Sequence, residues 1–187
     1  VHQNVAEFKK LLPKTTQNTI DAILEFVGTQ NCQKANNIVP TLFSISLVNK
    51  NISDLKPINS LVNLSELTLY KNNISDLTPL KSMTNLNRLI LGHNNISDLT
   101  PLSSLKNLER LYISSNKISD IKSLNTLKKL NTLHLNNNNI SDLTPLSKIT
   151  SLQELYLNNN KISDLTPLSN LTFLEELYLN NNKISNL

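Results

Sequence analysis

The sequence predicts an α/β solenoid, with a parallel sheet on its concave side and short 3₁₀ or extended segments on its convex side. First, the motif L-x-x-L-x-L-x-x-N-x-I recurs without insertion or deletion, and only its first copy departs from it appreciably. The seven copies begin at Leu42, Leu64, Leu86, Leu108, Leu130, Leu152 and Leu174. Second, a helical apolar pattern precedes the first copy. Third, the chain has only two glycines, which predicts turns built by Asn, Ser and Asp side chains.

Residues 1–41 are predicted to form a helical N-terminal cap, because a stacked array needs a cover over its first repeat. Two apolar stripes occur at helical spacing: Val5, Phe8, Leu11 and Leu12, then Ile20, Ile23, Leu24 and Val27. We expect Asn18 to be the N-cap of the second helix and Gly28 to lie just past its end. A short third helix is predicted to carry Cys32 and Ala35 on one face.

Residues 42–187 are predicted to form seven leucine-rich repeats of 22 residues, the last one incomplete. Within a repeat, Leu67 and Leu69 alternate inward as in a strand, and Leu80 and Met83 fill the core from the convex side. An asparagine recurs at the following turn and is expected to bond to backbone groups of its own and the next repeat. This column is Asn72, Asn94, Asn116, Asn138, Asn160 and Asn182, with Lys50 at the first turn.

The convex side carries Leu-Thr-Pro-Leu segments at 77–80, 99–102, 143–146 and 165–168, and the fourth repeat has no proline there. Short, proline-marked segments predict 3₁₀ or extended turns. An aspartate precedes each segment: Asp54, Asp76, Asp98, Asp120, Asp142 and Asp164. We expect these carboxylates to cap turns, because calcium ladders use glycine-rich repeats that this chain lacks.

The outward strand positions carry the candidate binding residues, and all four tyrosines are among them. Tyrosine favours interfaces, because it offers apolar area and one hydroxyl at a small entropy cost; it also stabilises exposed strands, so both interpretations stay open. Basic residues stand on the middle strands and acidic residues toward the C-terminus, where Glu175 adds to them. The predicted partner-binding residues are Tyr70, Arg88, Arg110, Tyr112, His134, Glu154, Tyr156, Glu176 and Tyr178.

Several functions lack support in the sequence. We find no motif for catalysis and predict no enzyme and no cofactor. His93 and His134 fall two strands apart without a third ligand, so no metal site is predicted. Cys32 has no neighbouring histidine and is expected to pack inside the cap. The net charge of +4 is dispersed, which argues against nucleic acid, and no apolar run is long enough to span a membrane.

The repeat N-x-I-S-D-L-T-P-L-S-x-L resembles the bacterial internalin-type leucine-rich repeat and, more distantly, the phosphatase-regulatory repeats. This resemblance implies a bacterial protein, secreted or at the cell surface, that binds a protein or peptide through its concave face. Two alternatives stay open: a substrate-targeting domain of a larger enzyme or effector, and a structural or adhesive surface array. The seventh copy stops at Leu187, so an uncapped edge could associate end to end.

Overall fold

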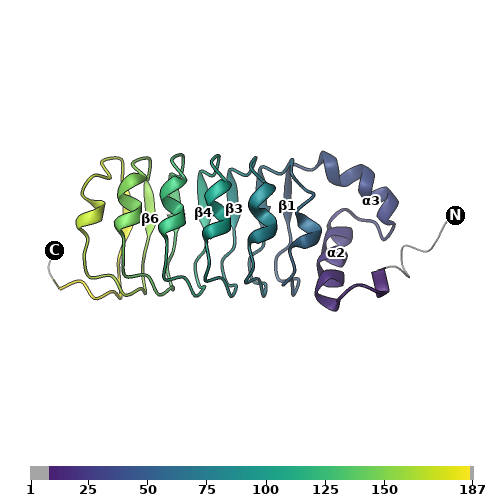
Figure 1. Ribbon diagram of the computed structural model, residues 1–187, viewed down its shortest axis with the longest axis horizontal. Helices are drawn as coiled ribbons and strands as arrows, with labels where there is room; N and C mark the ends of the chain where they lie inside the picture. The colour runs from purple at the N-terminus through teal and green to yellow at the C-terminus, as the bar shows by residue number, and fades with distance from the viewer. Residues whose placement is uncertain (1–8, 186–187) are drawn as a thin grey trace.

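A computed structural model describes residues 9–185 as an elongated row of stacked coils with helices at the N-terminal end (Figure 1). One parallel sheet runs through the row in sequence order. Its strands are β1 (Ser44–Ser46), β2 (Glu66–Thr68), β3 (Arg88–Ile90), β4 (Arg110–Tyr112), β5 (Thr132–His134), β6 (Glu154–Tyr156) and β7 (Glu176–Tyr178). Each strand pairs with its equivalent one repeat later, as Leu67 does with Leu89. The predicted α/β leucine-rich repeat solenoid is therefore confirmed.

The convex side consists of 3₁₀ helices, one for each of the first six repeats. They are η2 (Lys56–Ile58), η3 (Thr78–Ser82), η4 (Thr100–Ser104), η5 (Lys122–Thr126), η6 (Thr144–Lys148) and η7 (Thr166–Leu168). All except η5 have a proline in their first two positions, where a missing N–H costs nothing. The prediction of short 3₁₀ segments is confirmed. The η5 helix shows that a 3₁₀ helix forms at this position of the repeat without a proline.

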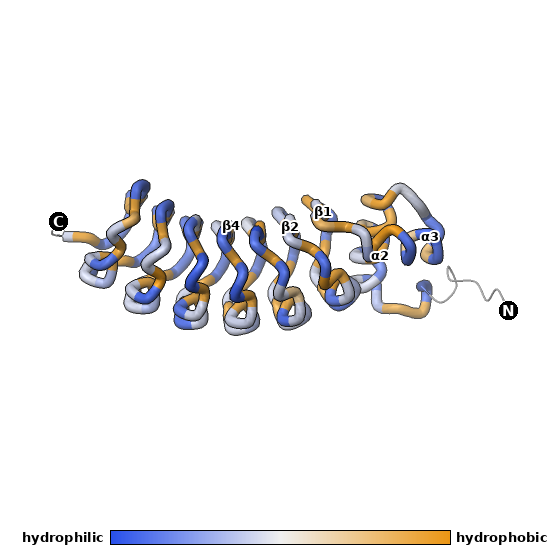
Figure 2. Tube along the Cα trace, turned by 90° about the horizontal axis from the view of Figure 1, so that it is seen from above, coloured by the Kyte–Doolittle hydropathy of each residue, from blue (hydrophilic) through white to orange (hydrophobic). Residues whose placement is uncertain are grey.

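The core is one continuous cluster that runs through the stack. Leu67, Leu69, Leu80 and Met83 have at most 1% of their surface exposed, as the motif predicts. Apolar and polar stretches alternate along the coils in a similar way from repeat to repeat (Figure 2). Because each repeat covers the next, the cluster extends from Ala22 in the cap to the seventh repeat.

The asparagine column bonds to backbone groups in two successive repeats. The Asn138 amide group donates to the carbonyls of Leu135, at 3.0 Å, and of Ile113 in the preceding repeat, at 3.2 Å. Its oxygen accepts from the buried N–H of Ile118, at 3.0 Å. Asn72 makes the same bonds to the first repeat, where Lys50 replaces the asparagine. The predicted column is confirmed, although each asparagine bonds to the repeat before it and not to the one after it.

The residue before each of these turn positions has a positive φ, a feature that the sequence analysis did not identify. These residues are Asn49, Lys71, His93, Ser115, Asn137, Asn159 and Asn181, with φ between 55° and 59°. Asparagine tolerates this left-handed conformation better than most residues, which explains why asparagine pairs recur here without glycine. The Asn-Asn pairs at 137–138, 159–160 and 181–182 were the available signal.

The cap contains α2 (Lys14–Phe26), α3 (Cys32–Ile38) and a short 3₁₀ helix, η1 (Val39–Thr41). Asn18 as N-cap was wrong: α2 begins earlier, with Pro13 at the N-cap, because Thr16 and Thr19 ahead of and beyond Asn18 are held by hydrogen bonds to Asp54. Gly28 follows the helix with φ 71°, as expected for a residue past the C-cap. Of the first predicted stripe, Val5 and Phe8 lie outside the described residues.

The cap deviates from prediction at two further side chains. Leu11 is 82% exposed and lies in a turn just before Pro13. Cys32 is only partly buried, since it occupies the first position of α3, whereas Ala35 one turn later is buried. Of the two residues predicted to share the inward face of α3, only Ala35 is therefore buried.

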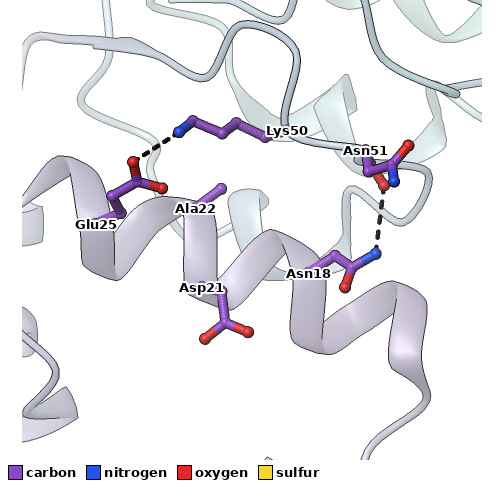
Figure 3. A pocket seen from close by; sticks show the side chains of 6 residues that line it. All are labelled: Asn18, Asp21, Ala22, Glu25, Lys50 and Asn51. Carbon is purple, nitrogen blue, oxygen red and sulfur yellow. Dashed lines mark hydrogen bonds and ion pairs between the residues drawn. The ribbon is translucent and has the colours of Figure 1, made fainter.

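Helix α2 is held against the first repeat by polar contacts. The Thr19 hydroxyl, fully buried, donates to the Asp54 carbonyl at 2.6 Å, and Thr16 donates to the Asp54 carboxylate at 2.5 Å. Figure 3 shows Glu25 on α2 directed toward Lys50, with a separation of 2.7 Å between Nζ and Oε1. The first aspartate of the column thus also fixes the cap.

Candidate functional site on the concave face

Four aromatic residues form a continuous column on the concave face, which we call the aromatic stack: Tyr112, His134, Tyr156 and Tyr178. They occupy the same register position on β4 to β7. Successive ring centroids lie 4.6, 4.0 and 4.4 Å apart. These distances approach the spacing of about 4.8 Å between neighbouring strands, so the sheet itself brings the rings into contact.

The rings of the aromatic stack cover one another's faces. The planes of His134 and Tyr156 differ by 27°, and those of Tyr156 and Tyr178 by 23°, while Tyr112 meets His134 edge on at 66°. The faces are therefore largely occupied within the protein. Ring edges and tyrosine hydroxyls remain as the surface that a partner would contact.

The hydroxyl of Tyr156 donates a hydrogen bond to Glu176 Oε2 at 2.7 Å. This bond to a carboxylate on the next strand is the main reason why the pKa of Tyr156 is raised above its usual value. Burial lowers the pKa of His134, and the negative charge of Glu176 opposes that shift. His134 Nε2 is buried without a hydrogen-bond partner among residues 9–185, so the neutral ring is favoured.

Charged side chains form a second column, two positions earlier on the strands. In order it reads Glu66, Arg88, Arg110, Thr132, Glu154 and Glu176. Arg88 lies 3.9 Å from Glu66 and has its guanidinium carbon 5.5 Å from the Tyr112 ring centroid. Within the described part of the chain, Arg110, Glu154 and Glu176 have no ion-pair partner within 4.0 Å.

Glu66 belongs to this column but was not among the predicted residues, although its position 22 residues before Arg88 was a sufficient signal. Tyr70 belongs to the predicted set but lies apart from the aromatic stack. Its ring meets His93 edge on, with centroids 5.1 Å apart, and Lys71 Nζ lies 5.4 Å from its centroid. The structure thus places eight predicted residues in two adjacent columns. Tyr70 lies outside both columns, closer to the turn.

The aspartate column caps the 3₁₀ turns, as predicted. Oδ1 of Asp98 accepts from the N–H of Thr100 at 2.8 Å, and equivalent bonds recur at Asp54, Asp76, Asp120, Asp142 and Asp164. Hydrogen bonds from Thr100 lower the pKa of the Asp98 carboxyl. The carboxylates therefore already have a structural role in the turns.

Other types of site find little support in the structure. In the range 9–185, no three His, Cys, Asp or Glu side chains are grouped closely enough to hold a metal ion. A depression of about 180 Å³ lies between α2 and the first repeat (Figure 3), lined by residues that include Asp21, Glu25 and Lys50. Another, of about 220 Å³, is lined by residues that include Asp120 and Asp142. Neither depression contains a predicted binding residue.

These features define the class of protein: a repeat solenoid whose exposed sheet carries aromatic and charged columns. The chain matches the family described as Leucine Rich repeats (2 copies) over residues 84–125, 106–148 and 150–187. It belongs to the leucine-rich repeat family, with the repeat type of bacterial internalins. No helix in the described range has the length and apolar character to cross a bilayer.

The similar solved structures include bacterial leucine-rich repeat proteins of two genera. An internalin C2 from Listeria monocytogenes is 33% identical, with a TM-score of 0.69, over 89% of this chain and 84% of that one. An internalin F from the same species is 37% identical, with a TM-score of 0.71, over 74% of this chain. A leucine-rich repeat protein from Leptospira interrogans is 33% identical, with a TM-score of 0.67, over 72% of this chain.

The last two alignments cover only 40% and 36% of those longer chains. A search of curated protein sequences gave no match.

Proposed function

We propose that this chain is a non-enzymatic protein-interaction module that binds a partner protein or peptide through its concave face. The observation that carries the proposal is the aromatic stack, which lies beside a column of charges in which Arg110, Glu154 and Glu176 have no ion-pair partner among the described residues. Aromatic residues and arginine dominate the binding energy of many interfaces. Membership of a repeat family that uses open sheets for recognition supports the same function.

Sheet stabilisation accounts for part of the arrangement but not for all of it. Stacking of His134 on Tyr156 stabilises neighbouring strands in the absence of any partner. Arg110, in contrast, is exposed and makes no ion pair with other residues in 9–185, so it contributes little to the stability of the sheet. Charges of opposite sign on one face favour recognition, because they orient an approaching partner.

The proposal assigns separate roles to the two parts of the chain. Residues 1–41 cap the first repeat, and residues 42–187 present the recognition surface. Resemblance to internalins supports a bacterial protein that acts outside the cell or on its surface. The partner is a protein or peptide.

The test is a selection from a displayed protein library, followed by affinity measurement with purified binders. The double variant Tyr112→Ala/Tyr156→Ala removes two rings of the aromatic stack. Each ring is expected to contribute about 1–2 kcal/mol, so affinity should fall by roughly 30-fold or more. Circular dichroism and urea unfolding establish that the variant remains folded.

Phe173→Ala is the matched control, because Phe173 is also aromatic and exposed but lies outside the strands. Its affinity for the selected binders should equal that of the wild type. Lys148→Ala, on the convex side, should also leave the affinity unchanged. Binders that retain full affinity for the folded double variant would move the binding site away from the aromatic stack.

A further inference from the structure

We propose that the partner segment crosses the strands in an extended conformation, with an acidic side chain at Arg110 and a basic side chain at Glu154 and Glu176. This inference rests on the proposed function and names the chemistry of the partner that the concave face fits. The partner is a peptide segment that contains both charges in a fixed order and at a fixed spacing.

The two arginines of the charged column differ in their neighbours. Arg88 already has Glu66 nearby at 3.9 Å, whereas Arg110 has no carboxylate within 4.0 Å among the described residues. Arg110 is therefore the cation that remains for an anionic group. Glu154 and Glu176 are adjacent in register, and like charges one strand apart repel each other. A cation between them would relieve this repulsion.

The hydrogen-bonding groups beside Glu154 and Glu176 also favour a basic side chain of the partner. The Tyr156 hydroxyl proton is used in the bond to Glu176, so the hydroxyl can offer only its oxygen as an acceptor. Glu176 keeps a second carboxylate oxygen, and Glu154 keeps both of its own. This part of the face therefore presents acceptors, which match the donors of an arginine or lysine side chain.

The spacing of the charges along the column matches that of side chains in an extended peptide. Two strand steps separate Arg110 from Glu154 and three separate it from Glu176, or about 10 and 14 Å at 4.8 Å per step. In an extended peptide, side chains on one face at i and i+4 lie about 13 Å apart. An acidic and a basic residue four positions apart therefore match this spacing, and the side chain between them lies over β5, where His134 is partly exposed and Thr132 is buried.

The experiment is a selection from a library of random 12-residue peptides displayed on phage. It uses the whole chain and, in parallel, the charge-exchanged variant Arg110→Glu/Glu154→Arg/Glu176→Arg. Counter-selection on Tyr112→Ala/Tyr156→Ala removes peptides that bind elsewhere. The wild type should enrich an acid and a base four positions apart in one order along the peptide. The exchanged variant should enrich the same spacing in the reverse order.

A second measurement makes the result quantitative. The best peptide and a version with its two charges exchanged are synthesised and titrated against both proteins by fluorescence anisotropy. The wild type should bind the original peptide about tenfold more tightly, and the exchanged variant should reverse this preference. Lys148→Glu, a convex charge change, should leave the wild-type preference unaltered.

The outcomes separate this inference from the proposed function. Peptides that depend on the aromatic stack but show no charge order, or an order that the exchanged variant does not reverse, would overturn the charge assignment alone. If no peptide distinguishes the wild type from Tyr112→Ala/Tyr156→Ala, the peptide inference fails, whereas the proposed function fails only if the displayed-protein selection also gives no binder that depends on the aromatic stack. Urea midpoints for each variant establish that the comparison is between folded proteins.

Discussion

Replacement of Asn138 by alanine should destabilise the solenoid substantially, although no apolar contact is lost. Asn138 is 8% exposed, and its side chain bonds to the backbone of two repeats. Alanine would leave the Ile118 N–H without its partner and remove one donor from each of two carbonyls. An unsatisfied buried donor costs about 1–3 kcal/mol, which sets the expected loss in the free energy of unfolding.

Urea unfolding followed by circular dichroism measures this loss as a shift of the midpoint at constant slope. Asn139→Ala is the matched control, because the neighbouring side chain is exposed and makes no hydrogen bond to another described residue. Its midpoint should stay within about 0.5 kcal/mol of the wild type. Equal midpoints for the two variants would refute the structural role of the asparagine column.

Three other predictions concern pH and local stability. Burial lowers the pKa of His134 below its unfolded value of 6.5, so stability should fall as pH drops below about 6.5, and His134→Gln should weaken this dependence in urea titrations. Bonds from Thr100 lower the pKa of Asp98, so its contribution is present above pH 3.8 and is lost as pH falls through the folded value. Asp98→Ala should lower the urea midpoint at pH 7, and Asp98→Asn, which keeps the acceptor oxygen but not the charge, should lower it less. Amide hydrogen exchange should be faster in β7, where Leu177 is 39% exposed, than in β6, where Leu155 is fully buried; equal protection would contradict this gradient.

The sequence was most informative where one residue type has one physical role in every repeat. Leucines at strand spacing must be buried, and a recurrent asparagine at a turn must bond to the backbone, so the core and the asparagine column could be predicted. The cap could not be predicted equally well, because it is not repeated. The start of α2 depends on the contacts of Thr16 and Thr19 with Asp54, more than thirty residues away in the chain.

The same distinction applies to the candidate site. Strand register follows from the 22-residue period, so the sequence by itself determined which side chains share a column on the concave face. Ring orientation, the bond from Tyr156 to Glu176 and the pairing of Arg88 with Glu66 depend on side-chain rotamers and on neighbours in adjacent repeats. Only the tertiary structure decided these features, because a periodic pattern fixes where a residue stands but not which of its neighbours it contacts.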